Sequence, residues 1–361
     1  AQEDSLPNAA PMPWRRRALL AGLLGLAAAS GLAAGPTRLL ETGSTLLYPL
    51  FNLWVSAYSA KAPGVQITTQ GTGSGTGIAQ AVSGLAQIGA SDAHMSAAQM
   101  RKNPGIMNIP LAISSQTVNY NLPGMADKNL KFSGPVLAGI YSGKITDWDD
   151  PALAKLNPGT RLPHKRIIPV HRNDSSGDTF IFTQYLSATN STWQTSVGYG
   201  TTVSWPAVPG GIGAEGNPGM VNALRGNPYA IGYVGISFKS AIAQDKLGEA
   251  MLENRSGKFV MATPETVGAA VAAAAAKTPP DERISLITAP GDNSYPIINY
   301  EYAIVKRQQR SKAVADALKG FLSWCIDPSG GSAAHFMQAV GFVPLPAAIA
   351  ALSKKQIDMI H

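Results

Sequence analysis

Glycine occupies every second position from Gly71 to Gly77, and this run connects two segments of different periodicity. Val65–Thr69 alternates between β-branched and polar residues, which predicts a strand. The residues after Gly77 have the apolar spacing of an amphipathic helix, and Gln87–Gly89 predicts a second short strand. Glycine lets backbone N–H groups approach a ligand, and the first turn of a helix leaves N–H donors unpaired. The stretch therefore predicts a βαβ unit whose loop, at the carboxyl end of a strand, can hold an anion.

Two other loops share this Ser/Thr/Gly composition and also precede helical segments. Thr42–Thr45 leads into residues 46–55, and Ser44 or Thr45 is the expected N-cap or first-turn residue there. Ser175–Thr179 lies between an apolar strand at Ile167–Val170 and a helix at residues 180–186. Helix capping explains any one of these loops. Three in one chain suggest helix N-termini that converge around a single anion.

Charged residues accompany two of these loops. Arg172 precedes the third loop, and the planar fork of its guanidinium suits an oxyanion. Asp174 follows two residues later and can hold the guanidinium by a salt bridge. Asp92 ends the Gly71–Asp92 stretch, where a carboxylate conflicts with anion binding. From the residues alone, Asp92 is more simply a helix cap or a loop turn.

The composition limits the classes of protein to which the chain can belong. Its 361 residues suffice for two lobes, and 45% hydrophobic with only 14% charged residues favours a folded protein. The net charge of +7 comes without a long Lys/Arg run, so nucleic acid is not an expected partner. We expect no metal and no organic cofactor, because the five histidines lack metal-ligand spacing. The single cysteine, Cys325, excludes an internal disulfide and is expected to be a buried small hydrophobe.

Residues 1–35 have the pattern of an export signal. Arg15, Arg16 and Arg17 precede a run of Ala, Leu and Gly that ends at Ala34 and is short for a membrane span. A cleaved signal is therefore expected, and with it a periplasmic or secreted protein. Both a twin-arginine signal and an ordinary secretory signal fit this pattern. No cysteine lies near the expected cleavage site, which argues against a lipid anchor there.

The rest of the chain alternates between strand and helix patterns. The expected strands lie at residues 108–113, 116–122, 230–234 and 296–305. The expected helices lie at residues 136–141, 267–277, 313–324 and 332–340. Residues 200–231 are rich in glycine and proline, which predicts surface loops.

Six motifs, taken together in order, resemble one known family. They are Thr42–Leu46, Gly71–Gly75, Ile88–Asp92, Ile145–Asp150, Arg172–Gly177 and Ile231–Val234. This set resembles the phosphate-binding proteins that serve the Pst-type ABC phosphate importer, most of all the mycobacterial type. The resemblance covers residues 40–361.

The resemblance implies an α/β, two-lobed periplasmic-binding-protein fold of the Venus flytrap kind, class II-like, with two hinge crossings near residues 119–123 and 297–302. Lobe I would comprise residues 36–120 and 299–361, and lobe II residues 121–298. The chain would be a monomer and not an enzyme. It would bind inorganic phosphate between the lobes and deliver it to the membrane permease of the importer.

The same resemblance implies a set of phosphate ligands. Carried over by motif position, they are Thr45, the Leu46 N–H, Ser74, Asp92, Arg172, Ser176 and the Gly177 N–H. Many members of the family have Thr at the next position, where this chain has Asp178, so Asp178 either touches the ligand or only caps its helix. Asp92 would accept a hydrogen bond from a P–OH group, which sulfate lacks at neutral pH.

Three other functions fit the same residues. A secreted phosphatase would use the anion pocket with Ser176 beside Asp178 as a nucleophile pair. A binder of another tetrahedral oxyanion, such as phosphonate or arsenate, would use the same donors, and arsenate also carries a proton near neutral pH. A secreted adhesion or scavenging protein would use the fold without a transporter.

Overall fold

The computed structural model describes residues 35–361, so the export signal expected in residues 1–35 lies almost wholly outside the described part. Pro36–His361 form one compact unit. No helix within residues 35–361 has the length and apolar character that a membrane span requires.

A nine-stranded mixed sheet runs through the unit in the order β2-β1-β3-β12-β4-β8-β6-β7, with β9 also paired to β4. Its strands are β1 Thr37–Gly43, β2 Val65–Gly71, β3 Ile88–Ser91, β4 Ile106–Tyr120, β6 Ile168–Arg172, β7 Ile212–Ala214, β8 Ala230–Gly235, β9 Gly248–Glu249 and β12 Ile298–Lys306. A small three-stranded sheet contains β5 Lys131–Phe132, β10 Met251–Glu253 and β11 Phe259–Val260.

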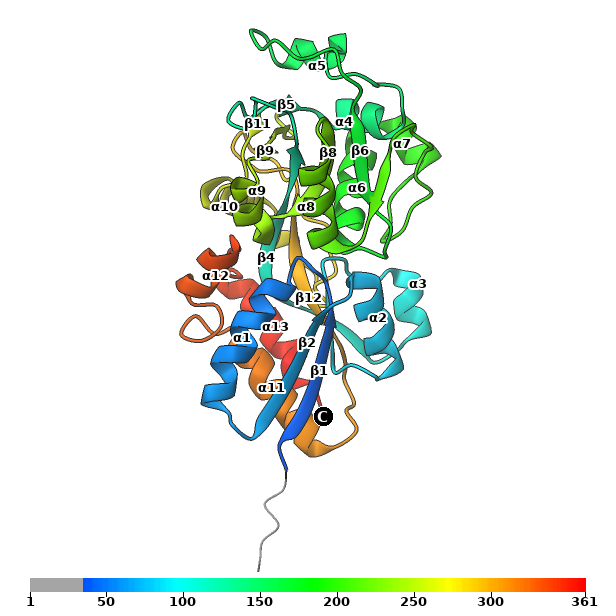
Figure 1. Cartoon of the computed structure of the whole chain (residues 1–361). Helices are drawn as coiled ribbons and strands as arrows, with labels where there is room; N and C mark the ends of the chain where they lie inside the picture. Colours follow the sequence, from blue (N-terminus) through cyan, green and yellow to red (C-terminus); the bar gives the residue numbers. More distant parts are fainter. Residues whose placement is uncertain (1–34) are drawn as a thin grey trace, which may run out of the picture. The chain divides into compact units, whose positions relative to one another are not determined.

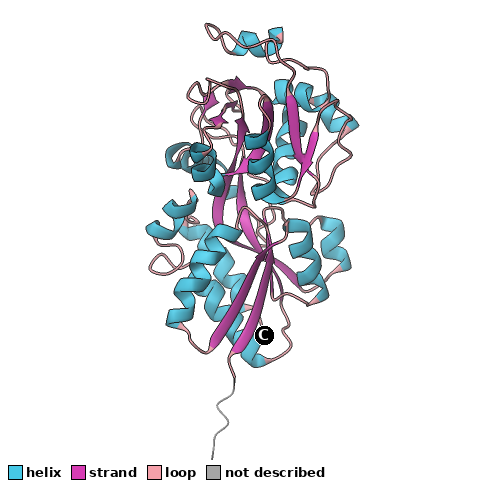
Figure 2. Ribbon diagram, in the orientation of Figure 1, coloured by secondary structure: helices cyan, strands magenta, loops and turns pink. Residues whose placement is uncertain are grey.

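Helices flank the strands on both sides (Figure 2). They are α1 Tyr48–Lys61, α2 Ser74–Ser83, α3 Ala97–Lys102, α4 Gly134–Tyr141, α5 Pro151–Leu156, α6 Gly177–Thr189, α7 Ser191–Ser196, α8 Gly216–Gly226, α9 Lys239–Gln244, α10 Pro264–Ala274, α11 Lys312–Cys325, α12 Ala334–Val340 and α13 Ala347–Asp358. Two short 3₁₀ turns, Ile236–Phe238 and Ala275–Lys277, complete the described elements.

Two long strands, β4 and β12, connect the two halves of the sheet (Figure 1). The first half contains β1, β2 and β3, and the second half contains β6, β7 and β8. The strands expected at residues 108–113 and 116–122 form one continuous strand, β4, of 15 residues that are all buried. β4 pairs with β12 from Ile106 to Ser115 and with β8 from Gln116 to Tyr120. The backbone therefore changes partners between Ser115 and Gln116 without ending the strand.

Parallel pairing explains why the Ser/Thr/Gly loops meet. β1 is parallel to both β2 and β3, so the loops after Gly43, Gly71 and Ser91 leave from the same edge. In the other half β6 is parallel to both β7 and β8, so the chain after Arg172 and Ala214 leaves from a common edge as well. Ligands of open α/β sheets bind at such carboxyl ends.

Each half has its own aromatic core. Phe51 and Trp54 of α1 pack edge to face in the first half. Phe182 stacks on Tyr233 in the second. Cys325 is fully buried, which confirms its prediction as a core residue, and burial raises the pKa of its thiol.

The prediction of surface loops for residues 200–231 was wrong in part. β7 and α8 occupy residues 212–226, and α8 buries Met220, Val221 and Leu224, which lie on one face at helical spacing. The proline, Pro218, lies in the first turn of α8, where its missing N–H would have no helical partner in any case. The local composition predicted a loop, but the apolar residues in the later turns of α8 form a buried face, which favours a helix.

Helix α2 packs closely against the strands at Gly77. A Cβ there would lie 2.6 Å from the Ala90 carbonyl oxygen and 2.8 Å from that of Thr42, both backbone atoms. Gly77→Ala should lower the free energy of unfolding by about 1–3 kcal/mol. Gly268→Ala in α10 adds the same methyl group with no atom within 4 Å and should raise stability by about 0.5–1 kcal/mol. Denaturant unfolding of both variants decides, and equal effects would contradict the close packing of α2.

Candidate functional site

Asp92 lies at the centre of a buried polar cluster built from the loops of the first half. Its side chain accepts a short hydrogen bond from the Ser44 hydroxyl and one of 3.3 Å from the Ser74 hydroxyl. The Asp92 N–H in turn donates to the Ser74 oxygen at 3.1 Å. All three residues are at most 2% exposed. The structure thus brings Ser74 and Asp92, both predicted site residues, into direct contact.

The third loop closes against this cluster from the second half. A Cβ on Gly177 would collide with the Asp92 carboxylate and the Ser74 hydroxyl, so only glycine fits there. The Gly75 N–H donates to the Ser175 carbonyl at 3.1 Å. The convergence of the loops, expected from composition alone, is therefore present in the structure.

Arg172 lies at the end of β6 with its side chain 1% exposed. Its Nε and Nη2 groups donate to the two oxygens of Asp174 at 2.6 and 2.5 Å, which confirms the expected salt bridge. Its Nη1 group donates to Asp178 at 3.0 Å. Burial lowers the pKa of Arg172, but the hydrogen bond to Asp174 and the charge of Asp178 more than offset it, so the pKa is raised.

Asp178 is more than a helix cap. It is 1% exposed, and its carboxylate accepts hydrogen bonds from Arg172, from Asn217 Nδ2 at 2.7 Å and from Gln116 Nε2 at 3.1 Å. Burial raises the pKa of Asp178, and Arg172 acts in the opposite direction. Asp178 is thus a buried counter-ion of Arg172.

Asn217 and Gln116 also belong to the cluster, although neither was predicted from the sequence. Asn217, from the segment expected to be a surface loop, donates its backbone N–H and its Nδ2 to Thr45 Oγ1, both at 3.0 Å. Its Oδ1 accepts from the Gly235 N–H. Gln116 is the first residue of β4 to pair with β8. Neither residue lies in a recognisable motif, because tertiary packing alone places them here.

The remaining predicted residues also lie at the loop ends. Ser176 is the N-cap of α6, and its oxygen accepts from the Thr179 N–H at 3.1 Å. The expected cap of the first helix was wrong: α1 begins at Tyr48 with Leu47 as N-cap, and Ser44 instead accepts from the Leu47 N–H at 3.0 Å. Among the hydrogen bonds of residues 35–361, none uses the N–H of Leu46 or Gly177.

The electrostatics of the cluster favour a shared proton. Burial is the main cause that raises the pKa of Asp92 to about 7, and the charge of Asp178 adds to it. Glu301 on β12 is likewise fully buried, and strand pairing places it beside Asp92. The motifs gave no sign of Glu301, because it lies within a strand far along the chain.

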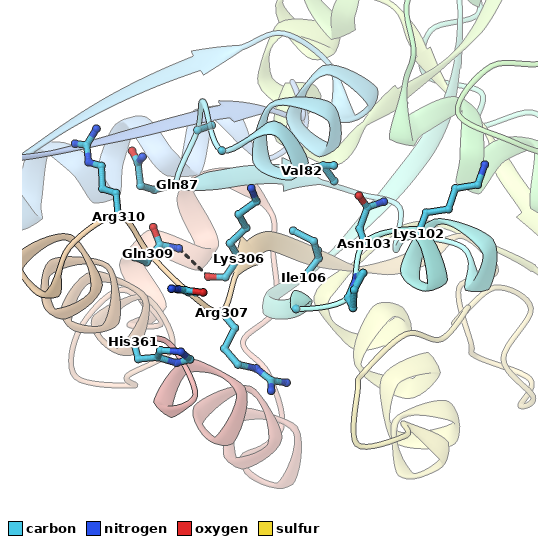
Figure 3. A pocket seen from close by; sticks show the side chains of 15 residues that line it. Val82, Gln87, Lys102, Asn103, Ile106, Lys306, Arg307, Gln309, Arg310 and His361 are labelled. Atoms are coloured by element: carbon cyan, nitrogen blue, oxygen red, sulfur yellow. Dashed lines mark hydrogen bonds between the residues drawn. The ribbon is translucent and has the colours of Figure 1, made fainter.

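A second group of cations lies at the opposite end of β4 and β12 (Figure 3). A cavity of about 700 Å³ there is lined by Lys102, Lys306, Arg307 and Arg310. Figure 3 shows that Lys306 and Arg307 point in opposite directions, so their charges do not converge on one point. No group of three or more His, Cys, Asp or Glu side chains in residues 35–361 is arranged to hold a metal ion.

The fold and the site define an α/β solute-binding protein with its polar site at the strand ends. A family profile described as the PBP superfamily domain matches residues 30–329. The phosphate-binding protein PstS of Methanocaldococcus jannaschii is 37% identical, over 88% of this chain and 85% of that protein. PstS3 of Mycobacterium bovis is 31% identical, over 89% and 86%. The chain belongs to the PstS family of phosphate-binding proteins.

A solved structure supports the fold independently. PfluDING, described as a high affinity periplasmic phosphate-binding protein bound with phosphate, superposes with a TM-score of 0.72. The two are 21% identical, over 88% of this chain and 93% of that one. The two-lobed periplasmic-binding-protein fold predicted from the sequence is confirmed.

We expect Arg172 to be essential for the stability of the protein even when no phosphate is present. Arg172→Ala leaves the half-buried Asp174 and the buried Asp178 carboxylates without their cation, and we expect a loss of about 3–5 kcal/mol in the free energy of unfolding. The double variant Arg172→Ala/Asp178→Ala should recover part of this loss, because it removes one of the stranded charges. Arg307→Ala, which removes an exposed cation, should change stability by less than about 0.5 kcal/mol. Denaturant unfolding of phosphate-free protein tests this, and equal stability of Arg172→Ala and Arg307→Ala would refute it.

Proposed function

We propose that this chain is an extracytoplasmic solute-binding protein that captures inorganic phosphate and delivers it to the membrane permease of an ABC importer. One observation carries the proposal: a buried carboxylate, Asp92, lies among hydroxyl and N–H donors where loops from both halves meet. Such a site suits an anion that brings its own proton. Both curated relatives described above are named phosphate-binding proteins.

The proposed phosphate ligands are the predicted set of Thr45, Leu46, Ser74, Asp92, Arg172, Ser176, Gly177 and Asp178. A guanidinium has five N–H donors, and three of those of Arg172 are occupied by Asp174 and Asp178. The other two remain for the ligand. Ser74 donates its hydroxyl to Asp92 and would redirect it to phosphate, whereas the oxygens of Thr45 and Ser176 accept hydrogen bonds, which leaves their O–H groups to donate to the ligand.

Positive charge alone does not account for anion binding here. Arg172 is already matched by two carboxylates, so its guanidinium brings no surplus charge to the site. Attraction must therefore come from the N-termini of α2 and α6 and from the backbone N–H groups before α1. Asp178 serves as the counter-ion that fixes the guanidinium for the ligand.

We propose Asp92 as the selectivity element. It accepts the hydrogen bond of a P–OH group, whereas sulfate has no proton to offer at neutral pH and would face an unpaired carboxylate. An unpaired buried polar partner costs about 1–3 kcal/mol, or roughly tenfold to a hundredfold in affinity. Arsenate carries a proton as phosphate does, so Asp92 should not discriminate against it.

The chain is not an enzyme in this proposal. A phosphatase would need Ser176 activated by Asp178, but the Ser176 oxygen caps α6 and the Asp178 carboxylate pairs with Arg172. Export through the N-terminal signal and a monomeric state complete the proposal. The PfluDING protein is described as periplasmic, which supports an extracytoplasmic location.

The phosphate proposal is tested by isothermal titration of desalted protein with phosphate, sulfate and arsenate. Wild type should bind phosphate about tenfold to a hundredfold more tightly than sulfate. Asp92→Asn should reduce this ratio about tenfold or more, whereas Asp316→Asn, which alters an exposed carboxylate on α11, should not. Equal affinity of the wild type for phosphate and sulfate would refute the selectivity mechanism, and no heat with any of the three anions would refute the function.

We also propose that residues 36–120 with 299–361 and residues 121–298 are two lobes that close on phosphate. The crossings are β4 and β12, and opening must break the Gly75–Ser175 and Asn217–Thr45 contacts. The radius of gyration from small-angle scattering should therefore fall when phosphate is added to desalted protein. Sulfate at equal ionic strength is the control, and an unchanged radius with phosphate would contradict closure.

A further inference from the structure

Glu301 is brought to Asp92 by strand pairing. In the antiparallel pair of β12 and β3, Tyr302 lies opposite Ser91, so the next position along places Glu301 beside Asp92. The pairing of β12 with β4 shifts register between Glu301 and Tyr302, which marks a β-bulge. The extra residue of this bulge is Leu111 on β4, so the register of β12 against β3 is unbroken.

The two oxygens of the Glu301 carboxyl have different surroundings. Oε1 accepts hydrogen bonds from the Ser114 hydroxyl at 2.5 Å and from Asn299 Nδ2 at 3.2 Å. Oε2 is buried and has no hydrogen-bond donor within residues 35–361. Strand pairing places Asp92 next to this side chain, and Asn299 Nδ2, which donates to Glu301 Oε1, also donates to the Asp92 carbonyl oxygen at 3.3 Å. Two acceptor groups in contact without a donor between them require a proton.

The neighbouring groups decide which carboxyl keeps that proton. Asp92 receives the hydroxyl groups of Ser44 and Ser74 and feels the charge of Arg172, all of which favour its ionised form, although Asp178 opposes it. Glu301 faces only the neutral donors Ser114 and Asn299 besides Asp92 itself. Burial, together with the charge of Asp92, raises the pKa of Glu301 well above its usual range.

We propose that Glu301 is a specificity-determining positioning residue of the phosphate site: its protonated carboxyl donates to Asp92 and holds Asp92 ionised as an acceptor for the P–OH group of the ligand. The proposal rests on the phosphate-binding function proposed above. It adds a group that does not touch the ligand itself.

The number of acceptor positions on Asp92 explains why donation from Glu301 is important. A carboxylate offers about four lone-pair positions. Ser44, Ser74 and Glu301 occupy three of those on Asp92, which leaves one for the ligand. If Glu301 cannot donate, Asp92 in this buried site takes up a proton itself. A protonated Asp92 is a donor, which no longer favours phosphate over sulfate.

Two substitutions separate donation from packing. Glu301→Gln keeps an oxygen for Ser114 and Asn299 and places an N–H₂ donor toward Asp92. Glu301→Met has a similar length but no donor. Affinities for phosphate and sulfate are measured at pH 8 and pH 6 by titration calorimetry on desalted protein, and thermal unfolding checks that each variant is folded.

Glu301→Met should lower the phosphate-to-sulfate affinity ratio at pH 8 by about tenfold or more, whereas Glu301→Gln should stay within about threefold of the wild-type ratio. In the wild type the ratio should fall from pH 8 to pH 6, because a second proton on the Asp92–Glu301 pair converts Asp92 into a donor. If Glu301 had a purely structural role, both variants would be less stable, but their phosphate-to-sulfate affinity ratios would equal that of the wild type.

The proposal is overturned if Glu301→Met keeps the wild-type ratio, or if Glu301→Gln loses as much as Glu301→Met. If Glu301→Met does not fold, carbon-13 NMR of the Asp92 carboxyl decides: it should titrate in two steps in the wild type and in one step in Glu301→Gln. A two-step titration in Glu301→Gln would also overturn the proposal. A wild type that binds no phosphate would refute the function, and a selective wild type with an unresponsive Glu301 would refute this inference alone.

Discussion

The burial of a carboxylate where loops from both halves of the sheet meet governs the structure around Asp92. A buried, isolated carboxylate is costly and would repel an anion, so hydrogen-bond donors around it must compensate its charge. Ser44 and Ser74 donate to it from two loops, and Gly177 brings a third loop into contact. Strand pairing places a second buried carboxyl, Glu301, beside it, and we propose that the two share a proton. In the function that we propose, this costly group becomes the means of recognising a ligand that carries a proton.

The buried cation of the cluster, Arg172, is compensated by its neighbours in a similar way. Arg172 is held by Asp174 and Asp178, and Asp178 in turn is held by Asn217 and Gln116. The guanidinium is therefore fixed in place by a network that crosses between the halves of the sheet. Asn217 also contacts Thr45, which links that network to the first loop of the chain. This network therefore fixes the position of the Arg172 guanidinium and leaves it no surplus positive charge.

Much of the fold was predictable because it depends on local periodicity. The βαβ unit around Gly71–Asp92 and the third loop before α6 follow from strand and helix patterns joined by glycine and hydroxyl residues. The salt bridge of Arg172 with Asp174 was predictable from their spacing. The prediction failed at residues 212–226, where glycine and proline in the first turn concealed a helix whose apolar face lies further along. It also failed at the start of α1, because a turn at residues 45–47 separates Ser44 from the helix, which begins at Tyr48.

The sequence by itself determined which loops open helices, that Arg172 accompanies one of them and that a carboxylate ends another, because each is a property of neighbouring residues. Only the tertiary structure decided that Asn217, Gln116 and Glu301 join the site. The register of β12 against β3 placed Glu301 beside Asp92, and a helix in a glycine-rich segment placed Asn217 beside Asp178. Local patterns carry no information about such contacts, which arise where strands distant in the chain pair and so bring buried polar groups together.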